Sequence, residues 1–455
     1  MSAKSLAAYL VLSTAFIFVV FASPALAQGT LYEGARLITG DGSAIEDSSF
    51  FVEGNQFTRI GRKGEVALPD GSARIDLTGK TVMPALIDTH VHLGYRKGLD
   101  FSPSNYTREN VTDTLDRFAY YGVGAILETG TARGDLGYQM RNELVGPRPL
   151  YMTAGRGLAM PNAGALGPMR GSGYGVTTDA EARADVEELA AKKADMVKIW
   201  VDDRAGTVEK LHPNLYRAII DEAHKHDMRV LAHVAKLEDA KDLLRAGVDG
   251  LAHMARVGNV DEELLALLKE RPGVFLQHVL WGEQLSFYNS KPAWVDEPIL
   301  RETLSPDEIR LLGEVFSQRG NPEALAQGEA LVSNIGRLKA AGARLVVGTD
   351  TGGVNGGQYF GFGTHIELEM LVTKGGLTPM EAIVAGTRDA AQVLRLDRLG
   401  TIAAGKEADF IVLNANPLDD IANTRKIERV YLRGQEVPRA ELKARWQAGF
   451  GTAAK

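Results

Sequence analysis

The chain has 455 residues, of which 45% are hydrophobic and 24% charged, and it carries a formal net charge of −7. This composition excludes an intrinsically disordered chain, a collagen-like repeat and a protein with several membrane spans. The acidic balance argues against a nucleic-acid-binding protein because no basic stripe is available for phosphate, and the absence of cysteine excludes disulfide bonds, thiolate catalysis, zinc fingers and iron–sulfur clusters.

The first 27 residues are predicted to be a signal peptide. Lys4 precedes an apolar run from Leu6 to Ala22, and Ala25-Leu-Ala27 has the small residues of a cleavage site. A single transmembrane anchor is the alternative, because the run approaches the minimum length of a span. No stop-transfer charges follow the run, so we expect cleavage near Gln28 and a periplasmic or secreted protein without stable membrane insertion.

The two ends of the mature chain are rich in short strands. Residues 28–82 and 396–455 contain segments that alternate apolar and polar residues between turns, which is typical of antiparallel sheets. Because both ends share this pattern, we expect one small β-sandwich assembled from both, with a C-terminal tail. The predicted strands are Ala35–Ile38, Ser49–Val52, Phe57–Ile60, Asp409–Leu413 and Glu428–Leu432.

The middle of the chain, residues 83–395, alternates apolar runs with amphipathic stretches. The stretches at Asp179–Lys193, Pro213–His226 and Leu237–Ala246 repeat their apolar residues at helical spacing. Eight strand-then-helix units predict an α/β fold, specifically a (β/α)8 TIM barrel. About sixty residues separate the last two runs, too many for a loop, and predict extra helices or a lid. The runs are Pro84–Thr89, Val123–Leu127, Leu150–Thr153, Met196–Trp200, Arg229–Ala232, Val248–Ala252, Val274–Gln277 and Leu345–Gly348.

Several possible metal ligands lie at the ends of these runs. In a TIM barrel the carboxyl ends of the strands meet at one mouth, so residues distant in sequence come together there. Imidazole nitrogens and a carboxylate suit Zn²⁺ or a similar divalent ion. Each residue alone is a weak signal, but the whole set predicts a metal site. The residues are His90 and His92 after the first run, His233 after the fifth, His253 after the sixth and Asp350 after the eighth, with Lys198 inside the fourth.

This pattern of ligands resembles the amidohydrolase superfamily, and three longer segments resemble it as well. The segment Gly79–His92 resembles the family's entry into its first strand, and Leu399–Leu413 resembles its return to the β-sandwich. The segment Leu368–Ala382 is most similar to the imidazolonepropionase-like branch, which includes secreted Xaa-Pro dipeptidase-like enzymes. The resemblance covers nearly the whole mature chain.

The resemblance implies a binuclear metal-dependent hydrolase that acts on C–N bonds. Its two divalent ions, Zn²⁺ before manganese or cobalt, would be held by His90, His92, Lys198, His233, His253 and Asp350. Carboxylation at N6 would turn Lys198 into a bridging ligand, although Lys198 could instead pair with Asp202 or Asp203 or point away from the site. A metal-bridged hydroxide would attack the amide of a dipeptide or an N-acyl amino acid.

Asp350 is the predicted catalytic residue, because a carboxylate at the last strand can accept the proton of the attacking water and return it to the leaving group. Four other residues are predicted to contact the substrate because they lie at or beyond strand ends: His278, His365, Trp200 and Trp281. The Gly-rich segment 155–175 is expected to be a loop over the site, not a nucleotide-binding loop.

Two other functions remain open at this point. The same binuclear site could hydrolyse a cyclic amide, a lactone or an ester, or the chain could be a periplasmic metal-binding protein without catalysis. The partners we expect are a small-molecule substrate and, by the same resemblance, further copies of the chain in a homo-oligomer.

Overall fold

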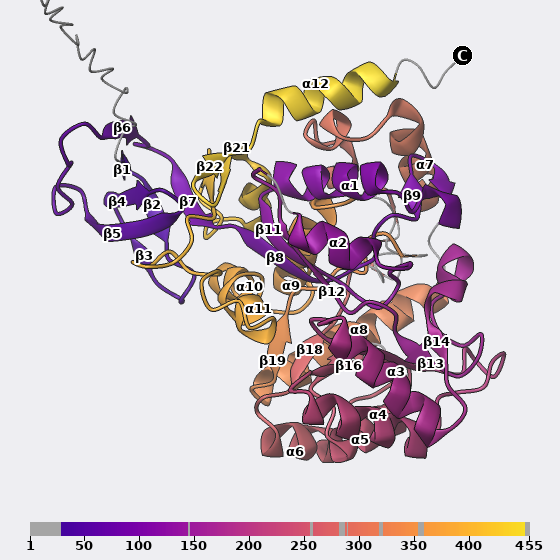
Figure 1. The fold of residues 1–455 in the computed structure, drawn as a ribbon. Coiled ribbons are helices and arrows are strands. Elements are labelled where there is room, and N and C mark those ends of the chain that lie inside the picture. Colours follow the sequence, from indigo (N-terminus) through magenta and orange to yellow (C-terminus); the bar gives the residue numbers. More distant parts are fainter. Residues whose placement is uncertain are drawn as a thin grey trace, which may run out of the picture.

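The computed structural model describes residues 29–143, 146–254, 258–281, 287–288, 290–317, 322–353 and 359–450. The predicted signal peptide lies outside these residues. The described chain has a β-rich part on one side and a larger part of parallel strands and helices on the other (Figure 1). Among the described residues, no helix combines the length and the apolar character that crossing a membrane requires.

The β-rich part contains two sheets. The first has the order β5 (Gln56–Arg62), β4 (Ser48–Glu53), β1 (Thr30–Glu33) and β6 (Ala73–Asp76). The second has the order β22 (Gln435–Glu436), β21 (Ile427–Leu432), β20 (Phe410–Leu413), β7 (Thr81–Pro84), β2 (Arg36–Ile38) and β3 (Ala44–Ile45). Strand β20 pairs antiparallel with β7, so the second sheet joins the two ends of the chain.

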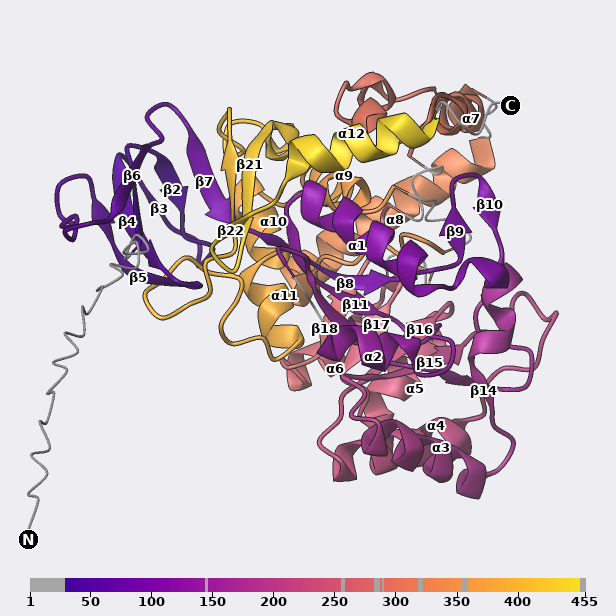
Figure 2. The same cartoon turned by 45° about the horizontal axis from the view of Figure 1, so that its top comes forward.

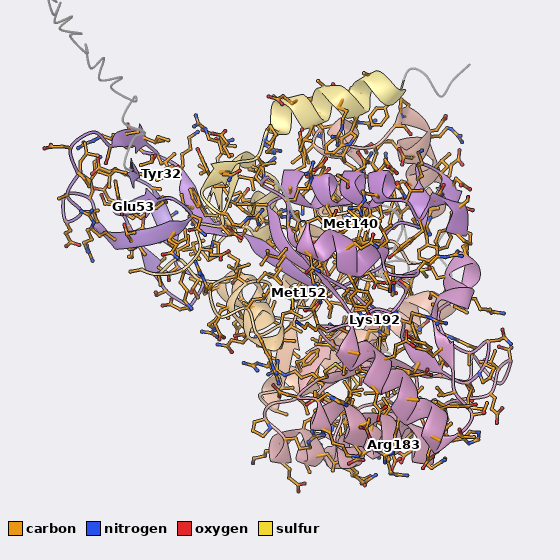
Figure 3. The ribbon with its side chains drawn as sticks, viewed as in Figure 1. Tyr32, Glu53, Met140, Met152, Arg183 and Lys192 are labelled. Carbon is orange, nitrogen blue, oxygen red and sulfur yellow. The ribbon has the colours of Figure 1, made fainter. Side chains whose placement is uncertain are left out.

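Aromatic side chains from both sheets share one apolar cluster. Tyr32 of the first sheet stacks on Phe50 with ring centroids 4.9 Å apart, and meets Phe410 of the second sheet edge-on at 5.3 Å. Phe410 in turn stacks on Tyr431 at 4.5 Å. Figure 3 shows Tyr32 in this part of the molecule and Arg183 in the other. The alternation of apolar residues that predicted these strands reflects this shared core.

Each of the eight apolar runs predicted as a strand overlaps a strand of the structure. These strands are β8 (Leu86–Val91), β11 (Val123–Glu128), β12 (Leu150–Thr153), β15 (Val197–Val201), β16 (Val230–Val234), β17 (Gly250–Ala252), β18 (Phe275–Gln277) and β19 (Arg344–Val346). They pair in parallel in the orders β12-β11-β8 and β15-β16-β17-β18-β19. Two short strands that the sequence did not predict, β13 (Leu158–Ala159) and β14 (Tyr174–Gly175), extend the second group beyond β15.

Backbone hydrogen bonds connect the two groups of parallel strands. Thr89 N donates to Val347 O at 3.0 Å, and Asp350 N donates to His90 O at 2.8 Å, which ties β8 to the residues after β19. At the other edge, β12 is followed directly by β13, which pairs with β15 through Leu158 and Ile199. The carboxyl ends of β8 and β19 therefore lie side by side.

Helices follow most of these strands, and several begin with the signals expected from the sequence. Thr178 and Thr378 form capping boxes with Glu181 and Glu381, and Pro379 occupies the first turn of its helix. The helices are α1 (Arg108–Tyr120), α2 (Leu136–Asn142), α3 (Asp179–Ala191), α4 (Pro213–Lys225), α5 (Leu237–Ala246), α6 (Glu262–Glu270), α7 (Pro306–Ser317), α8 (Pro322–Ala340), α9 (Phe362–Thr373), α10 (Pro379–Ala385), α11 (Arg388–Val393) and α12 (Arg439–Phe450).

Two of these helices fill the long connection before the last strand, as the sequence predicted. The residues between β18 and β19 include α7 and α8 as well as the short 3-10 helices Ala293–Asp296 and Leu300–Glu302. The last helix, α12, lies along α1, as both views show (Figures 1 and 2). Trp446 of α12 donates to Asp113 of α1 at 2.7 Å, which fixes the end of the described chain against the helical layer.

Candidate metal centre

The carboxyl ends of the parallel strands surround a cavity that contains every residue predicted as a metal ligand. His90 lies in β8 and His92 directly follows that strand. Lys198 lies in β15, His233 lies in β16, His253 directly follows β17, and Asp350 lies beyond β19. The parallel pairing of the strands brings these positions to one end of the sheet. The cavity is lined by His90, His92, Ala165, Leu166, Met169, Lys198, Trp200, Arg204, His233, His253, Asp350 and Gly353.

Three of these side chains form a compact group of donor atoms. His92 Nε2 lies 2.9 Å from Asp350 Oδ1, and His90 Nε2 lies 3.6 Å from the same oxygen. One ligand atom from each of the three residues lies within 4.8 Å of the others. The two histidines are two residues apart at the carboxyl end of β8, so their side chains point to the same side. Asp350 has φ 58°, and its carboxylate lies beside them.

The electrostatics of this group suit a cation. Burial and the neighbouring charge of Lys198 lower the pKa of His90 well below its usual value, so the imidazole is neutral and its Nε2 lone pair is available. Burial alone would raise the pKa of Asp350, but the hydrogen bond and charge of His92 lower it below its ordinary range. A carboxylate and two imidazoles are a donor set that Zn²⁺ accepts.

Each imidazole on β8 is held on its Nδ1 side by a buried polar residue. His90 Nδ1 lies 2.9 Å from Gln277 Oε1. Since the amide nitrogen of Gln277 donates to Thr89 O, its oxygen is the acceptor, and Nδ1 of His90 carries the proton. His92 Nδ1 lies 2.9 Å from Thr131 Oγ1, whose own proton goes to Glu128 Oε1 at 2.6 Å. Both histidines therefore present Nε2 to the cavity.

Lys198 reaches the same group from β15. Its side chain is almost fully buried, and its Nζ lies 3.4 Å from His90 Nε2. Gly130 allows this close packing, because a Cβ there would come within 2.8 Å of the Lys198 side chain. The neighbouring Trp200 is packed as tightly against Gly157 of the Gly-rich segment, where a Cβ would lie 2.3 Å from the indole ring. The glycines of that segment thus serve close packing around the site.

The remaining histidines of the set lie on the other side of the cavity. The rings of His233 and His253 are 4.6 Å apart, and those of His253 and His90 are 5.4 Å apart. His233 Nε2 lies 3.0 Å from Asp202 Oδ2 and 3.3 Å from Nη1 of Arg204. The six residues thus surround one small volume from two sides.

Three of the four predicted substrate contacts lie away from the cavity lining. His278 is buried, and burial lowers its pKa to about 4. His365 donates from Nε2 to Tyr121 O at 2.7 Å, and Trp281 packs against Trp294 with ring centroids 5.4 Å apart. Trp200 is the member of this set that lines the cavity.

The sequence interpretation missed four polar residues near the predicted ligands. Gln277 precedes His278 at the end of β18, and alternation along the strand turns Gln277, not His278, toward His90. Glu128 is the last residue of β11, Thr131 follows β11, and Arg204 follows β15. Each lies at or just after a strand's carboxyl end, so the reasoning that identified the ligands could have included them.

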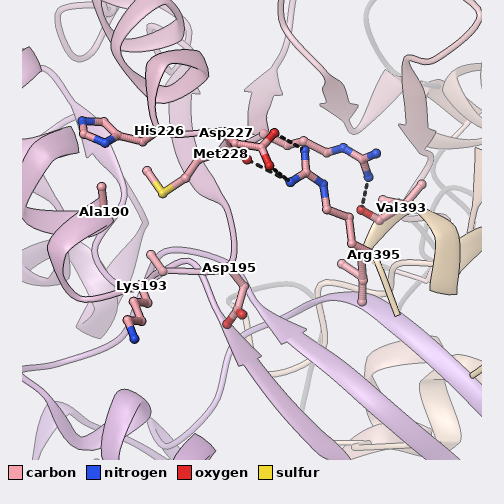
Figure 4. A pocket seen from close by; sticks show the side chains of 11 residues that line it. Ala190, Lys193, Asp195, His226, Asp227, Met228, Val393 and Arg395 are labelled. Atoms are coloured by element: carbon pink, nitrogen blue, oxygen red, sulfur yellow. Dashed lines mark hydrogen bonds and ion pairs between the residues drawn. The ribbon is translucent and has the colours of Figure 1, made fainter. Parts of the chain in front are cut away.

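A second cavity, of about 320 Å³, lies where β15 and β16 begin (Figure 4). Two of its charged side chains, Arg395 and Asp227, pair with each other. Arg395 forms two bonds to the Asp227 carboxylate, at 2.6 and 2.8 Å, and Arg229 donates to Val393 O. Ligands of parallel α/β sheets bind outside the carboxyl ends of the strands, so the first cavity is the candidate site.

The chain is similar to known proteins over most of its length. The family model described as "Amidohydrolase family" matches residues 81–437. An ochratoxinase of Aspergillus niger is 27% identical over 443 residues, which cover 88% of this chain and 84% of that protein. An imidazolonepropionase of Deinococcus radiodurans is 27% identical over 414 residues, covering 88% and 94%. The crystal structure of a Xaa-Pro dipeptidase with bound methionine in its active site superposes with a TM-score of 0.71 at 24% identity, over 90% of this chain and 99% of that one.

Proposed function

The chain belongs to the amidohydrolase family, and on that basis we propose that it is a metal-dependent hydrolase of the amide bonds of dipeptides or N-acyl amino acids. The observation that carries this proposal is the meeting of six potential ligands, which lie in or directly after five parallel strands, in one cavity. The ochratoxinase and the imidazolonepropionase, each similar over 88% of this chain, support hydrolysis of a C–N bond.

The residues present fit two divalent ions, with Zn²⁺ as the first choice. His90, His92 and Asp350 form one close donor group, and His233 and His253 form a second pair of imidazoles across the cavity. We propose that Lys198, carboxylated at Nζ, completes the set between them. When bound, a divalent ion polarises an amide carbonyl and lowers the pKa of water from 15.7 to about 7.

The chain's own residues would carry the proton transfers. Asp350 accepts a proton from the attacking water and gives it to the leaving amine. Gln277 and Thr131 hold the Nδ1 sides of His90 and His92, so that both Nε2 atoms stay directed at the cavity. Trp200, with Met169 and Leu166, provides the apolar surface against which a substrate side chain would pack.

We further propose that the eight parallel strands close into a (β/α)8 barrel and that the two terminal sheets form a β-sandwich. The backbone bonds from β8 to the residues after β19 support the first statement, and the aromatic cluster shared by the two sheets supports the second. Export to the periplasm or the medium is also a proposal, based on the apolar N-terminal segment.

The experiment that tests this function combines metal analysis with a substrate panel. We expect about two metal ions per chain and loss of activity on chelation. One ion or none in freshly purified active protein would contradict the binuclear site. The panel should contain dipeptides, N-acyl amino acids, cyclic amides, lactones and esters. Absence of turnover on the whole panel by metal-loaded protein would favour a non-catalytic metal-binding protein.

Hydrolysis of a cyclic amide is the second candidate. The similarity to an imidazolonepropionase, whose name denotes a ring substrate, favours it. Faster turnover of the cyclic amides than of the open-chain amides would replace the first proposal with this one.

A further inference from the structure

Arg204 lines the cavity beside the potential ligands, at the start of the loop between β15 and α4. Its backbone has φ 51°, and Ala205 after it has φ 56°, so two consecutive non-glycine residues adopt the left-handed conformation. Such positions cost free energy and persist where the surrounding contacts require them. Asp202 supplies one such contact, since its Oδ1 accepts a hydrogen bond from Arg204 N at 2.8 Å.

Two neighbouring residues, Asp202 and Gly164, hold the guanidinium of Arg204 in place. Nη1 forms an ion pair with Asp202 Oδ2 at 2.8 Å, and Nη2 donates to Gly164 O at 3.1 Å. Gly164 belongs to the Gly-rich segment, so the guanidinium joins two loops at the mouth of the site. Only 17% of the Arg204 side chain is exposed. A planar, buried and fixed guanidinium is pre-organised to bind a carboxylate through two parallel hydrogen bonds.

The charges that line the cavity favour an anionic ligand. The lining residues include two basic side chains, Lys198 and Arg204, and one carboxylate, Asp350. If Lys198 is carboxylated, Arg204 is the basic side chain that remains in the lining, and its ion pair with the buried Asp202, which lies outside the lining, holds it in place. A dipeptide or an N-acyl amino acid carries its carboxylate one carbon from the nitrogen of the scissile amide, close enough to meet a residue at the rim of the same cavity.

From these observations we propose that Arg204 binds the carboxylate of the substrate and thereby restricts the enzyme to amides that carry one beside the scissile nitrogen. The inference rests on the proposed amidohydrolase function and adds its specificity-determining residue. The competing role, which the experiment separates from this one, is orientation of His233, whose Nε2 lies 3.3 Å from Nη1 of Arg204.

The test compares substrates with and without the carboxylate. N-acetyl derivatives of alanine, phenylalanine and lysine are prepared as free acids and as carboxamides. Steady-state kinetics give KM and kcat for the wild-type protein and for Arg204→Met and Arg204→Lys. Binding of each compound is measured by calorimetry in an Asp350→Asn background, so that this readout does not depend on turnover. Arg183→Met is the control, because Arg183 pairs with Asp221 and Glu222 on the surface of α3 and α4.

We expect the Asp350→Asn protein with Arg204 intact to bind at least one acid about 10- to 100-fold more tightly than its carboxamide, as suits a charge-assisted pair. Arg204→Met should lose this preference mainly through KM, Arg204→Lys should keep part of it, and Arg183→Met should keep all of it. Equal binding of acid and carboxamide by the Asp350→Asn protein with Arg204 intact would overturn the inference. Equal losses for acid and carboxamide in Arg204→Met would also overturn it, since this is the result of disturbing His233 alone.

The two proposals can fail separately. A carboxylate preference in binding, without hydrolysis of any amide, would refute the proposed function and retain the role of Arg204. Hydrolysis of the carboxamides as fast as the acids would retain the function and refute that role.

Discussion

The Nδ1 atom of His92 lies 2.9 Å from the hydroxyl oxygen of Thr131, and this contact connects the imidazole to a carboxylate that does not line the cavity. Glu128 Oε1 accepts from both the backbone nitrogen and the hydroxyl of Thr131, at 2.7 and 2.6 Å. All three side chains are buried. Because the Thr131 hydroxyl donates its proton to Glu128, it can act only as an acceptor toward His92. Nδ1 of His92 therefore carries the proton, and Nε2 has a lone pair that can bind a metal.

Removing this hydroxyl should weaken metal binding without unfolding the protein. Thr131→Val keeps the shape of the side chain and loses the acceptor, and we expect about a 10- to 100-fold lower metal affinity in chelator competition. Thr131→Ser keeps the hydroxyl, so its metal affinity should stay near that of the wild-type protein. Thr58→Val, in the β-rich part, is the control. An unchanged affinity in Thr131→Val would show that the contact does not orient His92.

Substitutions of Lys198 test whether its amine takes part in metal binding. Lys198→Ala should lose most of the bound metal and of the activity. Short carboxylic acids, added without bicarbonate, should restore part of the activity if they replace a carboxylated amine. Lys198→Arg should not recover, because a guanidinium stays protonated. Wild-type metal content and activity in Lys198→Ala would assign a purely structural role to this residue.

The sequence predicted the eight parallel strands that surround the cavity because their signal is local. An apolar run bounded by turns marks each of these eight strands, and the capping box at Thr378 marks a helix start within four residues. The short strands β13 and β14 were missed because they are two residues each, and their pairing depends on how the Gly-rich segment packs around Trp200.

The potential ligands were predictable for the same reason, since each lies at or near a strand end. The direction of a side chain beyond the strand end was not predictable. His278 and Gln277 are adjacent, and only the register of β18 decides which of them contacts His90. His365 and Trp281 turn into the core, where burial of a large ring is favourable. Arg204 was missed because its position depends on two left-handed residues that no sequence pattern marks.

Asp409 should make the stability of the protein depend on pH. Burial raises the pKa of Asp409 to about 7, and its Oδ2 has no hydrogen-bond partner among the described residues. The unfolded chain loses this proton near the ordinary pKa of about 3.9. Between these two pH values the folded state binds more protons, so the free energy of unfolding falls as pH rises and then levels off above pH 7.

Asp409→Asn should remove this part of the pH dependence. A shift of about three pKa units corresponds to about 4 kcal/mol over the whole range. We expect denaturant unfolding of the metal-free protein between pH 5 and pH 8 to show a smaller loss of stability in the variant than in the wild type. Asp88 and Glu367, whose pKa values burial raises to about 6 and about 8, should leave a residual slope of the same sign. Asp397→Asn, on the surface, is the control, and an identical slope in Asp409→Asn and wild type would contradict the prediction.

Asp350→Asn should keep the fold but lose most of kcat. The asparagine oxygen can still face His92, so metal content should largely survive, but the amide cannot take a proton from the attacking water at any accessible pH. General acid–base assistance of this kind contributes about 10²- to 10⁴-fold, or about 3–5 kcal/mol of barrier at 1.36 kcal/mol per tenfold. The loss should appear in kcat more than in KM, because the proton moves in the transition state and not during binding. Steady-state kinetics on one good substrate, with metal content measured on the same samples, separates this effect from loss of the ions. If the variant keeps its metals and more than about a tenth of the wild-type kcat, the loss is smaller than that range. Another residue must then carry the proton.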